Sequence, residues 1–298
     1  MMKTSFSSYM LVIVLAMIAC NAEEIDHKNI GLEREKLVVN GLTNNQNDTS
    51  FFQLSTSEYA YKDSLPKKIK ENDANIIFFI NGKNQKVEFA PFQEKFYVVN
   101  KIKQGDILKI EAEKDGFSKI ISSTQVPILP NDWQIEVIAG KGLDSRNEPS
   151  DIIQISFKDF ENQRNYYGLK LFYLEEGTNE LRDVIFEKND IAFLGSDFLE
   201  QNDRTLIFSD QSFDGQNKTL QIVPESGQGN FNTDIKYVLK FYHLHPDYYR
   251  YLSSLKSYKD DFGDNQLSPF RLTSGLFSNV QNGLGIWTSQ NLRIDTLR

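Results

Sequence analysis

The chain has 298 residues, with 33 lysines and arginines against 41 aspartates and glutamates, which gives a formal net charge of −8. This acidic balance argues against nucleic acid and anionic lipid headgroups as partners. The length allows two domains or one large β-domain, and 22 Phe and 13 Tyr favour strands over helices. Because Cys20 is the single cysteine, no intrachain disulfide can form.

Residues 1–19 are predicted to be a lipoprotein signal peptide. Lys3 precedes an apolar stretch, residues 10–19, that is too short to cross a hydrocarbon core, which needs about 20 residues. Ile18 and Ala19, directly before Cys20, resemble the end of a bacterial lipoprotein box. By that resemblance Cys20 becomes the first mature residue, with a diacylglycerol on its sulfur and an acyl chain such as palmitate on its amine. The alternative is a cysteine that is discarded with the signal peptide.

Residues 20–36 are predicted to be an acidic tether, because they are polar and charged without a sustained period. Its start, with Glu23, Glu24 and Asp26, resembles the surface-export signal of Bacteroidota lipoproteins. Several acyl chains on one cysteine would hold the chain stably on a membrane. We therefore expect lipid anchoring at the outer membrane, with the body of the protein facing the cell exterior.

Residues 37–130 are predicted to form the first domain. They contain about seven short apolar runs separated by turn residues, a pattern typical of a small β-sandwich. The segment "NIIFFINGKNQKVEF" at 75–89 contains Asn81 followed by Gly82, and both residues tolerate a positive φ. This pair between two apolar runs indicates a β-hairpin.

Residues 131–298 are predicted to form a second antiparallel β-sandwich. Pro127 and Pro130 interrupt the strand pattern, which places the boundary there, and no strand–helix–strand alternation follows. Pro246 begins a predicted helix over 246–258, and Asn282-Gly283 predicts a C-terminal hairpin. The predicted fold class is therefore all-β, with two antiparallel sandwiches and one short helix near the C-terminus.

Several segments resemble one family in their order and spacing. They are "KLVVNGL" at 36–42, "ILKIEAEKDGF" at 107–117, an F-x-D at 157–159, "NYYGLKLFYL" at 165–174, "FSDQSFDGQ" at 208–216, "YYRYLSSL" at 248–255 and "SNVQNGLGIW" at 278–287. The family is a set of Bacteroidota outer-membrane lipoproteins catalogued as domain of unknown function 4249. The resemblance implies an accessory lipoprotein that works beside a TonB-dependent receptor, with no established reaction. The N-terminal part also resembles the immunoglobulin-like module related to carboxypeptidase regulatory domains.

His243 and His245 are the sharpest candidates for metal ligands. Alternate residues of a strand point to the same side and could offer two imidazoles to one ion. The alternative is that one packs at the rim of the core while the other, just before Pro246, caps the helix. The remaining histidine, His27, lies in the predicted tether, so a third ligand is missing and we expect no metal.

Catalytic signatures are few. "YLEEG" at 173–177 and "YKDDFGD" at 258–264 supply paired carboxylates of the kind that glycoside hydrolysis uses. The second could also bind calcium, but a solvated acidic loop is the commoner arrangement. No G-x-S-x-G or Walker lysine motif occurs, the "GQG" at 227–229 is incomplete as a dinucleotide loop, and the histidines offer little general-base capacity. We therefore expect no enzymatic activity and no cofactor beyond the covalent lipid on Cys20.

Aromatic side chains could form a platform for a sugar or a peptide. The candidates are Trp133, Tyr166, Tyr167, Phe213, Tyr248, Tyr249 and Trp287. Their strand and helix-stripe positions favour the core for most of them. The tripeptides "DSL" at 63–65 and "DTL" at 295–297 resemble the O-glycosylation acceptor of Bacteroidota.

The expected function is that of a non-catalytic outer-membrane lipoprotein that assists a TonB-dependent transporter or binds a ligand at the cell surface. A structural or adhesive surface protein is one alternative, and a surface hydrolase is another. The ligand, the contact surface with a partner and the oligomeric state stay open.

Overall fold

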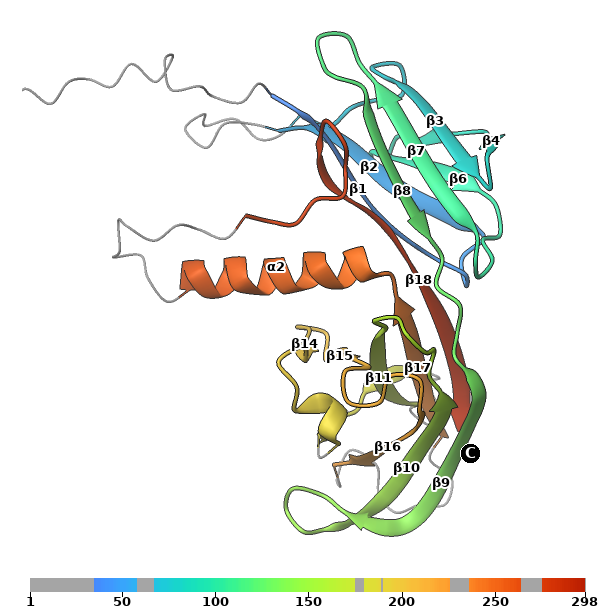
Figure 1. Cartoon of the computed structure of the whole chain (residues 1–298), viewed down its shortest axis with the longest axis vertical. Helices are drawn as coiled ribbons and strands as arrows, with labels where there is room; N and C mark the ends of the chain where they lie inside the picture. The colour runs from blue at the N-terminus through green and yellow to red at the C-terminus, as the bar shows by residue number, and fades with distance from the viewer. Residues whose placement is uncertain are drawn as a thin grey trace, which may run out of the picture. The chain divides into compact units, whose positions relative to one another are not determined.

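The computed structural model describes residues 35–57, 67–174, 180–188, 190–225, 236–263 and 275–297 (Figure 1). Strands dominate these residues, beside one short 3-10 helix, η1 (Ile191–Phe193), and one α-helix, α2 (Pro246–Gly263). The predicted all-β fold with a helix near the C-terminus is confirmed. The helix begins at Pro246, where proline suits the first helical position because it has no N–H to leave unpaired.

The longest sheet runs in the order β14-β15-β11-β17-β18-β1-β2-β6-β5, with β12 beside β11. Its strands are β14 (Leu199–Glu200), β15 (Leu206–Ser209), β11 (Tyr166–Leu174), β17 (Lys236–Leu244), β18 (Leu284–Leu297), β1 (Leu37–Asn44), β2 (Thr49–Thr56), β6 (Lys95–Val99), β5 (Glu88–Ala90) and β12 (Leu181–Asp183).

Two shorter sheets run in the orders β4-β3-β7-β8 and β13-β16-β10-β9. Their strands are β4 (Lys83–Gln85), β3 (Asn75–Ile80), β7 (Ile107–Glu113), β8 (Ile120–Gln125), β13 (Phe186–Glu187), β16 (Asn217–Pro224), β10 (Pro149–Lys158) and β9 (Asn131–Leu143). The predicted turn at Asn81-Gly82 is confirmed: it joins β3 to β4 with φ of 50° and 76°.

Each shorter sheet packs on part of the long sheet and encloses a core of its own. The N-terminal core gathers buried side chains of β1, β2 and β6 with those of β3, β7 and β8, and includes a stacked pair, Phe52 and Phe78, with ring centroids 6.1 Å apart. The C-terminal core gathers β10 and β16 with β11, β15 and β17 around Phe157 and Phe241. Alternating burial along strands such as β7 produces these faces, because successive residues point to opposite sides.

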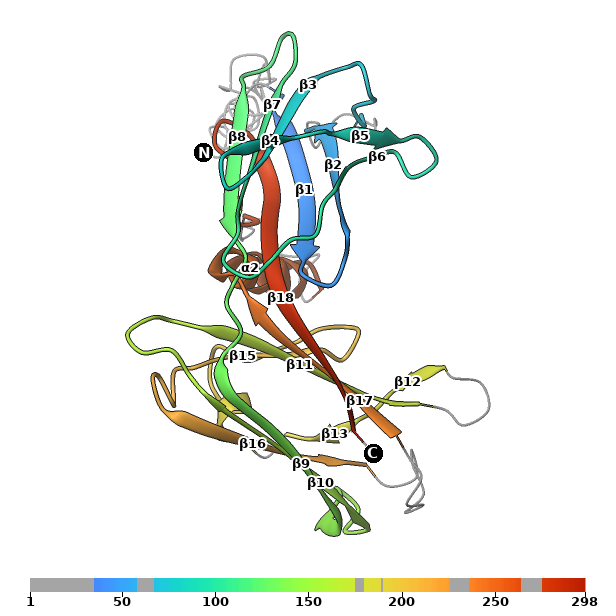
Figure 2. The same ribbon diagram turned by 90° about the vertical axis from the view of Figure 1, so that its right-hand side faces the viewer.

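Strand β18 contributes to both cores. Its first half pairs in parallel with β1 and its second half pairs antiparallel with β17 (Figure 2). Trp287 is fully buried in the N-terminal core, whereas Leu297 packs in the C-terminal core. The division of the chain at residue 130 stays a prediction, as does the immunoglobulin-like character of the N-terminal sandwich.

The predicted hairpin at Asn282-Gly283 does not form in the described residues. Gln281, before the turn, makes an isolated bridge with Ile121 of β8 instead of pairing with β18. The first half of β18, residues 284–290, pairs with β1, and the second half, residues 290–297, pairs with β17. The parallel pairing of β1 with β18 also departs from the predicted antiparallel arrangement.

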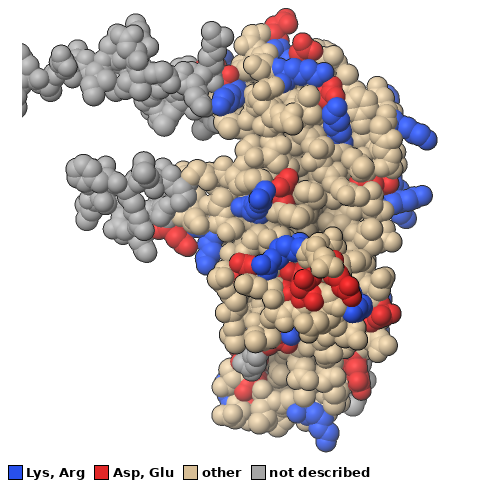
Figure 3. Space-filling view, viewed as in Figure 1, with Lys and Arg blue, Asp and Glu red and all other residues tan. Residues whose placement is uncertain are grey.

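Helix α2 covers the face of the long sheet that lies opposite the C-terminal core (Figure 1). It buries Tyr249 and Leu252 against Leu199, Ile207 and Leu244. Within the described residues, no helix has the length and apolar character needed to span a membrane. On the face that Figure 3 shows, acidic and basic side chains are interspersed, in line with the mixed charges of the sequence.

Candidate functional site

Two loops at one end of the C-terminal sandwich each place a buried carboxylate beside its core. Asp159 directly follows β10 and Asp210 directly follows β15, and these residues are only 3% and 1% exposed. The antiparallel pairing of Tyr166 with Ser209 sets the start of β11 beside the end of β15. The loops 159–165 and 210–216 therefore meet at one edge of the sandwich.

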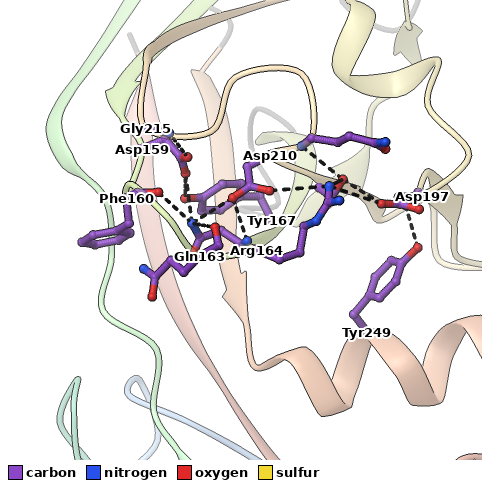
Figure 4. Close-up of polar contacts among 12 residues, drawn as sticks. Asp159, Phe160, Gln163, Arg164, Tyr167, Asp197, Asp210, Gly215 and Tyr249 are labelled. Atoms are coloured by element: carbon purple, nitrogen blue, oxygen red, sulfur yellow. Dashed lines mark hydrogen bonds and ion pairs between the residues drawn. The ribbon is translucent and has the colours of Figure 1, made fainter.

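Asn165 joins the two loops through contacts with Asp159 and Asp210, the two acids labelled in Figure 4. Its backbone N–H donates to Asp210 Oδ2 at 2.7 Å, and its side-chain Nδ2 donates to the same oxygen at 2.9 Å. The same Nδ2 lies 3.4 Å from Asp159 Oδ1. A buried carboxylate needs such donors because burial without them costs several kcal/mol, so Asn165 holds both acids in place.

Asp159 has two further donors. The Tyr167 hydroxyl donates to its Oδ1 at 2.5 Å, and the Gly215 N–H donates to its Oδ2 at 2.9 Å. Tyr167 is itself fully buried, and its ring lies 5.2 Å from that of Phe157. We call Asp159, Asn165, Tyr167 and Asp210 the buried network. It ties the loop after β15 to the strands of the core.

Burial sets the protonation of the network. It raises the pKa of Asp210 to about 6, against the smaller opposing effect of the Asn165 hydrogen bonds, and the charge of Asp159 acts in the same direction as burial. Burial also raises the pKa of Asp159, although the bonds from Tyr167 and Gly215 oppose the shift. The pKa of Tyr167 rises as well, through burial and its bond to Asp159. Asp210 therefore changes charge in the weakly acidic range.

Arg164 extends the network toward helix α2. Its Nη1 lies 3.6 Å from Asp197 Oδ2 and 3.9 Å from Asp210 Oδ1. Ser209 Oγ donates to the same Asp197 carboxylate at 3.0 Å, and the Tyr249 hydroxyl donates to the Asp197 backbone carbonyl at 3.1 Å. These contacts connect the loop after η1, the loop before β11 and the helix (Figure 4).

Among the described residues, one group of three side chains has the makings of a metal site: Asp159, Asp210 and Asp214 each place a carboxylate oxygen within 4.8 Å of the others. Both oxygens of Asp159 already accept hydrogen bonds from the protein, and Asp210 Oδ2 accepts two. Calcium takes about six to eight oxygen ligands. The protein's own donors thus satisfy most of these oxygens, which marks the group as a brace between loops.

A pocket of about 360 Å³ lies beside the network, and we call it the linker pocket. The connection between β8 and β9 supplies one wall with Val126, Pro127 and Ile128, and the loop before β11 supplies Phe160 and Gln163. The remaining wall comes from the end of β17 and the start of α2, residues 243–246. Gln125, Arg164 and Asn165 complete the lining, so the pocket combines apolar and polar residues in equal number.

The two histidines that the sequence suggested as metal ligands both line the linker pocket. Their Nδ1 atoms make different hydrogen bonds within the protein. His243 Nδ1 lies 2.6 Å from the Ile128 carbonyl oxygen, and burial lowers the pKa of His243 to about 4, so the ring is neutral and Nδ1 is the donor. His245 Nδ1 accepts from the Asp247 N–H at 3.2 Å at the start of α2, and burial lowers its pKa too. Neither imidazole belongs to the three-carboxylate group.

The residues of the buried network belong to three of the segments on which the family resemblance depends: the F-x-D at 157–159, "NYYGLKLFYL" and "FSDQSFDGQ". A family model described as Domain of unknown function (DUF4249) matches residues 22–292. The chain belongs to this family. The DUF4249 match includes the N-terminal core, the C-terminal core apart from Leu297, the buried network and the linker pocket. No curated protein matches the sequence.

In this DUF4249 chain, sequence reasoning did not identify Asp159, Asn165 or Asp210 as site residues. A signal was present: in both F-x-D and "FSD" an acid directly follows an apolar strand, at the point where the chain leaves the sheet. An isolated carboxylate at that position indicates a partner elsewhere in the fold. That Asn165 is the partner depends on the pairing of β11 with β15, which the sequence does not show.

The predicted aromatic platform does not form as one surface. Trp287, Tyr167, Phe213 and Tyr249 are buried in the cores or under the helix. Trp133 packs on the C-terminal core, and Tyr166 stacks on Tyr249 with ring centroids 4.0 Å apart. Tyr248 is the candidate that lines a pocket.

Several predicted positions lie outside the described residues. They are Cys20, His27, Asp63, Glu175, Glu176, 227–229 and Asp264, together with the side chain of Asp261. Asp295 of the "DTL" tripeptide lies within the described residues, and its Oδ2 accepts a hydrogen bond from Arg293 Nε at 2.9 Å.

Proposed function

We propose that this chain is a binding protein anchored by lipid on Cys20 to the outer membrane, where it faces the cell exterior and assists a TonB-dependent transporter. Membership of the DUF4249 family and the residues before Cys20 support the anchored location. The acidic composition is consistent with a partner other than nucleic acid or anionic lipid. The observation that carries the binding role is the linker pocket.

The linker pocket has the properties of a binding site. Its volume of about 360 Å³ lies within the range of roughly 300–1,000 Å³ that is usual for small-ligand sites. Apolar walls supply contact area, and Gln163 and His245 supply polar groups that orient a ligand. The buried network holds the loop that carries Phe160 and Gln163, and binding residues work best on loops that a rigid scaffold positions.

The chemistry of the linker pocket favours binding over catalysis. None of its lining residues is Ser, Thr, Cys or Lys, so no hydroxyl, thiol or amine nucleophile of these types faces the space. His243 donates through Nδ1 to Ile128 and is kept neutral by burial. The pocket therefore suits an apolar or aromatic group of a ligand or of a partner protein that also carries a polar group within reach of Arg164.

Two measurements test the location and the partner. The full chain with a C-terminal tag is expected to stay with washed membranes and, after solubilisation, to bring down a TonB-dependent transporter. Cys20→Ser is expected to release the chain from the membrane, because the acyl chains would be lost. A Cys20→Ser chain that stays membrane-bound contradicts the anchor. A chain that always purifies alone contradicts the transporter role and favours the adhesive alternative, in which deletion alters surface contact but leaves uptake unchanged.

A filling substitution tests the pocket. Gln163 is exposed at the rim, and Gln163→Trp would place an indole in the linker pocket while leaving the backbone contacts of the loop intact. We expect this variant to lose the co-purifying partner. Gln221→Trp, on the exposed face of β16, is the matched control and should keep it. Equal recovery of the partner with both variants would show that binding occurs elsewhere.

One observation favours a surface hydrolase as a second candidate. Asp210, whose pKa of about 6 suits a general acid, and Asp214 line an open pocket of about 280 Å³ together with Arg164. Against it, Asp210 is almost fully buried and is bound by Asn165. A panel of nitrophenyl glycosides and esters tests this candidate. Turnover that Asp214→Asn abolishes would favour a hydrolase, and no turnover of any member supports the binding role.

A further inference from the structure

A second pocket lies under helix α2, on the face of the long sheet opposite the C-terminal core. We call it the helix pocket, and its volume is about 250 Å³. Ile207 and Leu244 form the apolar floor, and Leu252 and Tyr248 come from the helix. The turn between β14 and β15 and the side chain of Gln290 close the sides. The pocket shares only Leu244 with the linker pocket.

Tyr242 supplies an aromatic surface in this pocket. It faces Gly168 across the antiparallel β11–β17 pair. A Cβ atom at Gly168 would lie 3.1 Å from both Cβ and Cδ2 of Tyr242. Because Gly168 has no side chain, the tyrosine can pack directly against the β11 backbone. Tyr242 lines the pocket and remains half-buried. Its ring is thus backed by the sheet on one side and available to a ligand on the other.

Four polar side chains of the helix pocket have no hydrogen-bond partner in the described part of the protein. No hydrogen bond there involves the hydroxyl of Tyr242 or Tyr248, or the side-chain amide of Gln201 or Gln290. Burial raises the pKa of both tyrosines to about 12, and the charge of Asp203 adds to both shifts. The phenols are therefore neutral, and each can donate and accept a hydrogen bond, as can the amides.

The charge in the pocket is largely balanced. Asp203 accepts from the Thr205 N–H at 3.1 Å and lies 3.4 Å from Lys170 Nζ, which also contacts Asp183 at 3.3 Å. A strongly charged ligand would thus find no unopposed charge among these groups. The pocket offers instead two aromatic residues and several neutral donors and acceptors.

We infer that the helix pocket binds one ring of a neutral polyhydroxylated ligand, that is, a single sugar unit. The C–H face of such a ring packs on Tyr242, and its hydroxyls pair with phenol and amide groups that the protein leaves unpaired. A volume of about 250 Å³, below the usual range for drug-sized ligands, suits one ring and excludes a longer chain from the pocket itself. This site is separate from the linker pocket and depends on neither the anchor nor the transporter.

Saturation-transfer NMR on the full chain tests the inference. The protein is kept in a detergent without a sugar headgroup, and the probes are glucose, galactose, mannose and N-acetylglucosamine, their methyl glycosides and a trisaccharide of each. Cyclohexanol, which has a ring but one hydroxyl, is the control ligand. We expect at least one sugar to receive saturation at its ring protons and cyclohexanol to receive none. Binding of methyl glycosides and trisaccharides indicates the end of a glycan, and binding of the reducing sugar alone indicates a free monosaccharide.

Variants locate the signal. Tyr242→Ala should abolish saturation transfer, and Gln201→Ala should weaken the affinity about tenfold, the loss of roughly one good hydrogen bond. Gln221→Ala on the exposed face of β16 should change nothing. Circular dichroism checks the fold, and if Tyr242→Ala unfolds, Gln201→Ala at the rim of the turn carries the test. No transfer from any sugar, or transfer that persists when the pocket is altered, overturns the inference.

Discussion

Gly41 and Trp287 face each other across the parallel pair of β1 and β18, and the indole occupies the space that a side chain at Gly41 would need. A Cβ atom built on Gly41 would lie 2.6 Å from Cζ3 of Trp287 and 2.9 Å from Cβ of Phe52. The indole in turn packs edge-on against Phe52 and Phe78, with centroids 5.8 Å and 5.5 Å away. A residue near the C-terminus thus completes the core of the N-terminal sandwich.

Gly41→Ala is expected to lower the free energy of unfolding by about 1–3 kcal/mol, because the added methyl must displace the indole or the Phe52 side chain. Urea unfolding followed by tryptophan fluorescence measures the change. Gly275→Ala is the control, since no atom lies within 4 Å of a Cβ at that exposed position, and its effect should stay within about 0.5 kcal/mol. Equal effects of the two variants would show that Trp287 is free to move.

Asn165→Ala should destabilise the protein by about 2–3 kcal/mol. The substitution removes the amide that serves Asp159 and Asp210 and leaves two buried carboxylates short of donors. The backbone N–H to Asp210 survives, so the fold itself should persist. Thermal and urea unfolding report the loss, with Gln163→Ala in the same loop as the control. An Asn165→Ala protein as stable as Gln163→Ala would mean that the network contributes no net stability.

Asp210→Asn should stabilise the protein at neutral pH. Burial raises the pKa of Asp210 from 3.8 to about 6. Between these two pH values the folded state keeps a proton that the unfolded state has already released. The contribution of this group is therefore full below pH 3.8 and lost as the pH rises through about 6. Removing the charge should add about 1–3 kcal/mol at pH 7 and little at pH 4. Asp214→Asn, at an exposed acid in the next turn, is the comparison.

His243→Gln should change the pH dependence of stability over the same pH window, in the direction opposite to the change made by Asp210→Asn. Burial lowers the pKa of His243 to about 4, so between pH 4 and 6.5 the unfolded state binds the proton more readily. The contribution of His243 is full above pH 6.5 and is lost as the pH falls through about 4. A glutamine amide can still donate to the Ile128 carbonyl but does not titrate. We therefore expect this variant, in which Asp210 still titrates, to gain stability relative to the parent on acidification from pH 6.5 to pH 4.

The two titrations can be separated by measuring urea unfolding of the parent and both variants from pH 4 to pH 7. In the parent, Asp210 and His243 oppose each other over this window. Asp210→Asn should leave a stability that rises with pH, and His243→Gln one that falls with pH. If both variants keep the slope of the parent, neither buried group titrates as its burial implies.

Local features of the fold were predictable because short-range preferences fix them. The turn at Asn81-Gly82 requires positive φ at two adjacent residues, which these residues adopt readily. Pro246 marks the first turn of α2 for a similarly local reason. The alternation of apolar and polar residues along strands such as β7 identifies the face that becomes buried. Each of these signals lies within a few residues of chain.

The candidate site was less predictable. His243 and His245 do line a pocket, but their surroundings come from Ile128 and Phe160, which are distant in the sequence. The acids at the centre of the network were visible as single residues after strands. Their proximity depends on β11 pairing with β15 and on Asn165 lying between them. The aromatic candidates were correctly expected to lie mostly in the core, yet Tyr242 was not recognised, because its role depends on Gly168 in the neighbouring strand.

By itself, the sequence determined the strand-rich class, the helix near the C-terminus and its start, the hairpin turn and the family, because all of these depend on residue type and order along the chain. The tertiary structure decided that β18 joins both sandwiches, that Asp159 and Asp210 share one asparagine, and that the space under α2 is lined by phenols and amides without hydrogen-bond partners among the described residues. Those outcomes depend on which strands become neighbours. That choice is made by the burial of apolar side chains summed over the whole chain, and no short segment carries it.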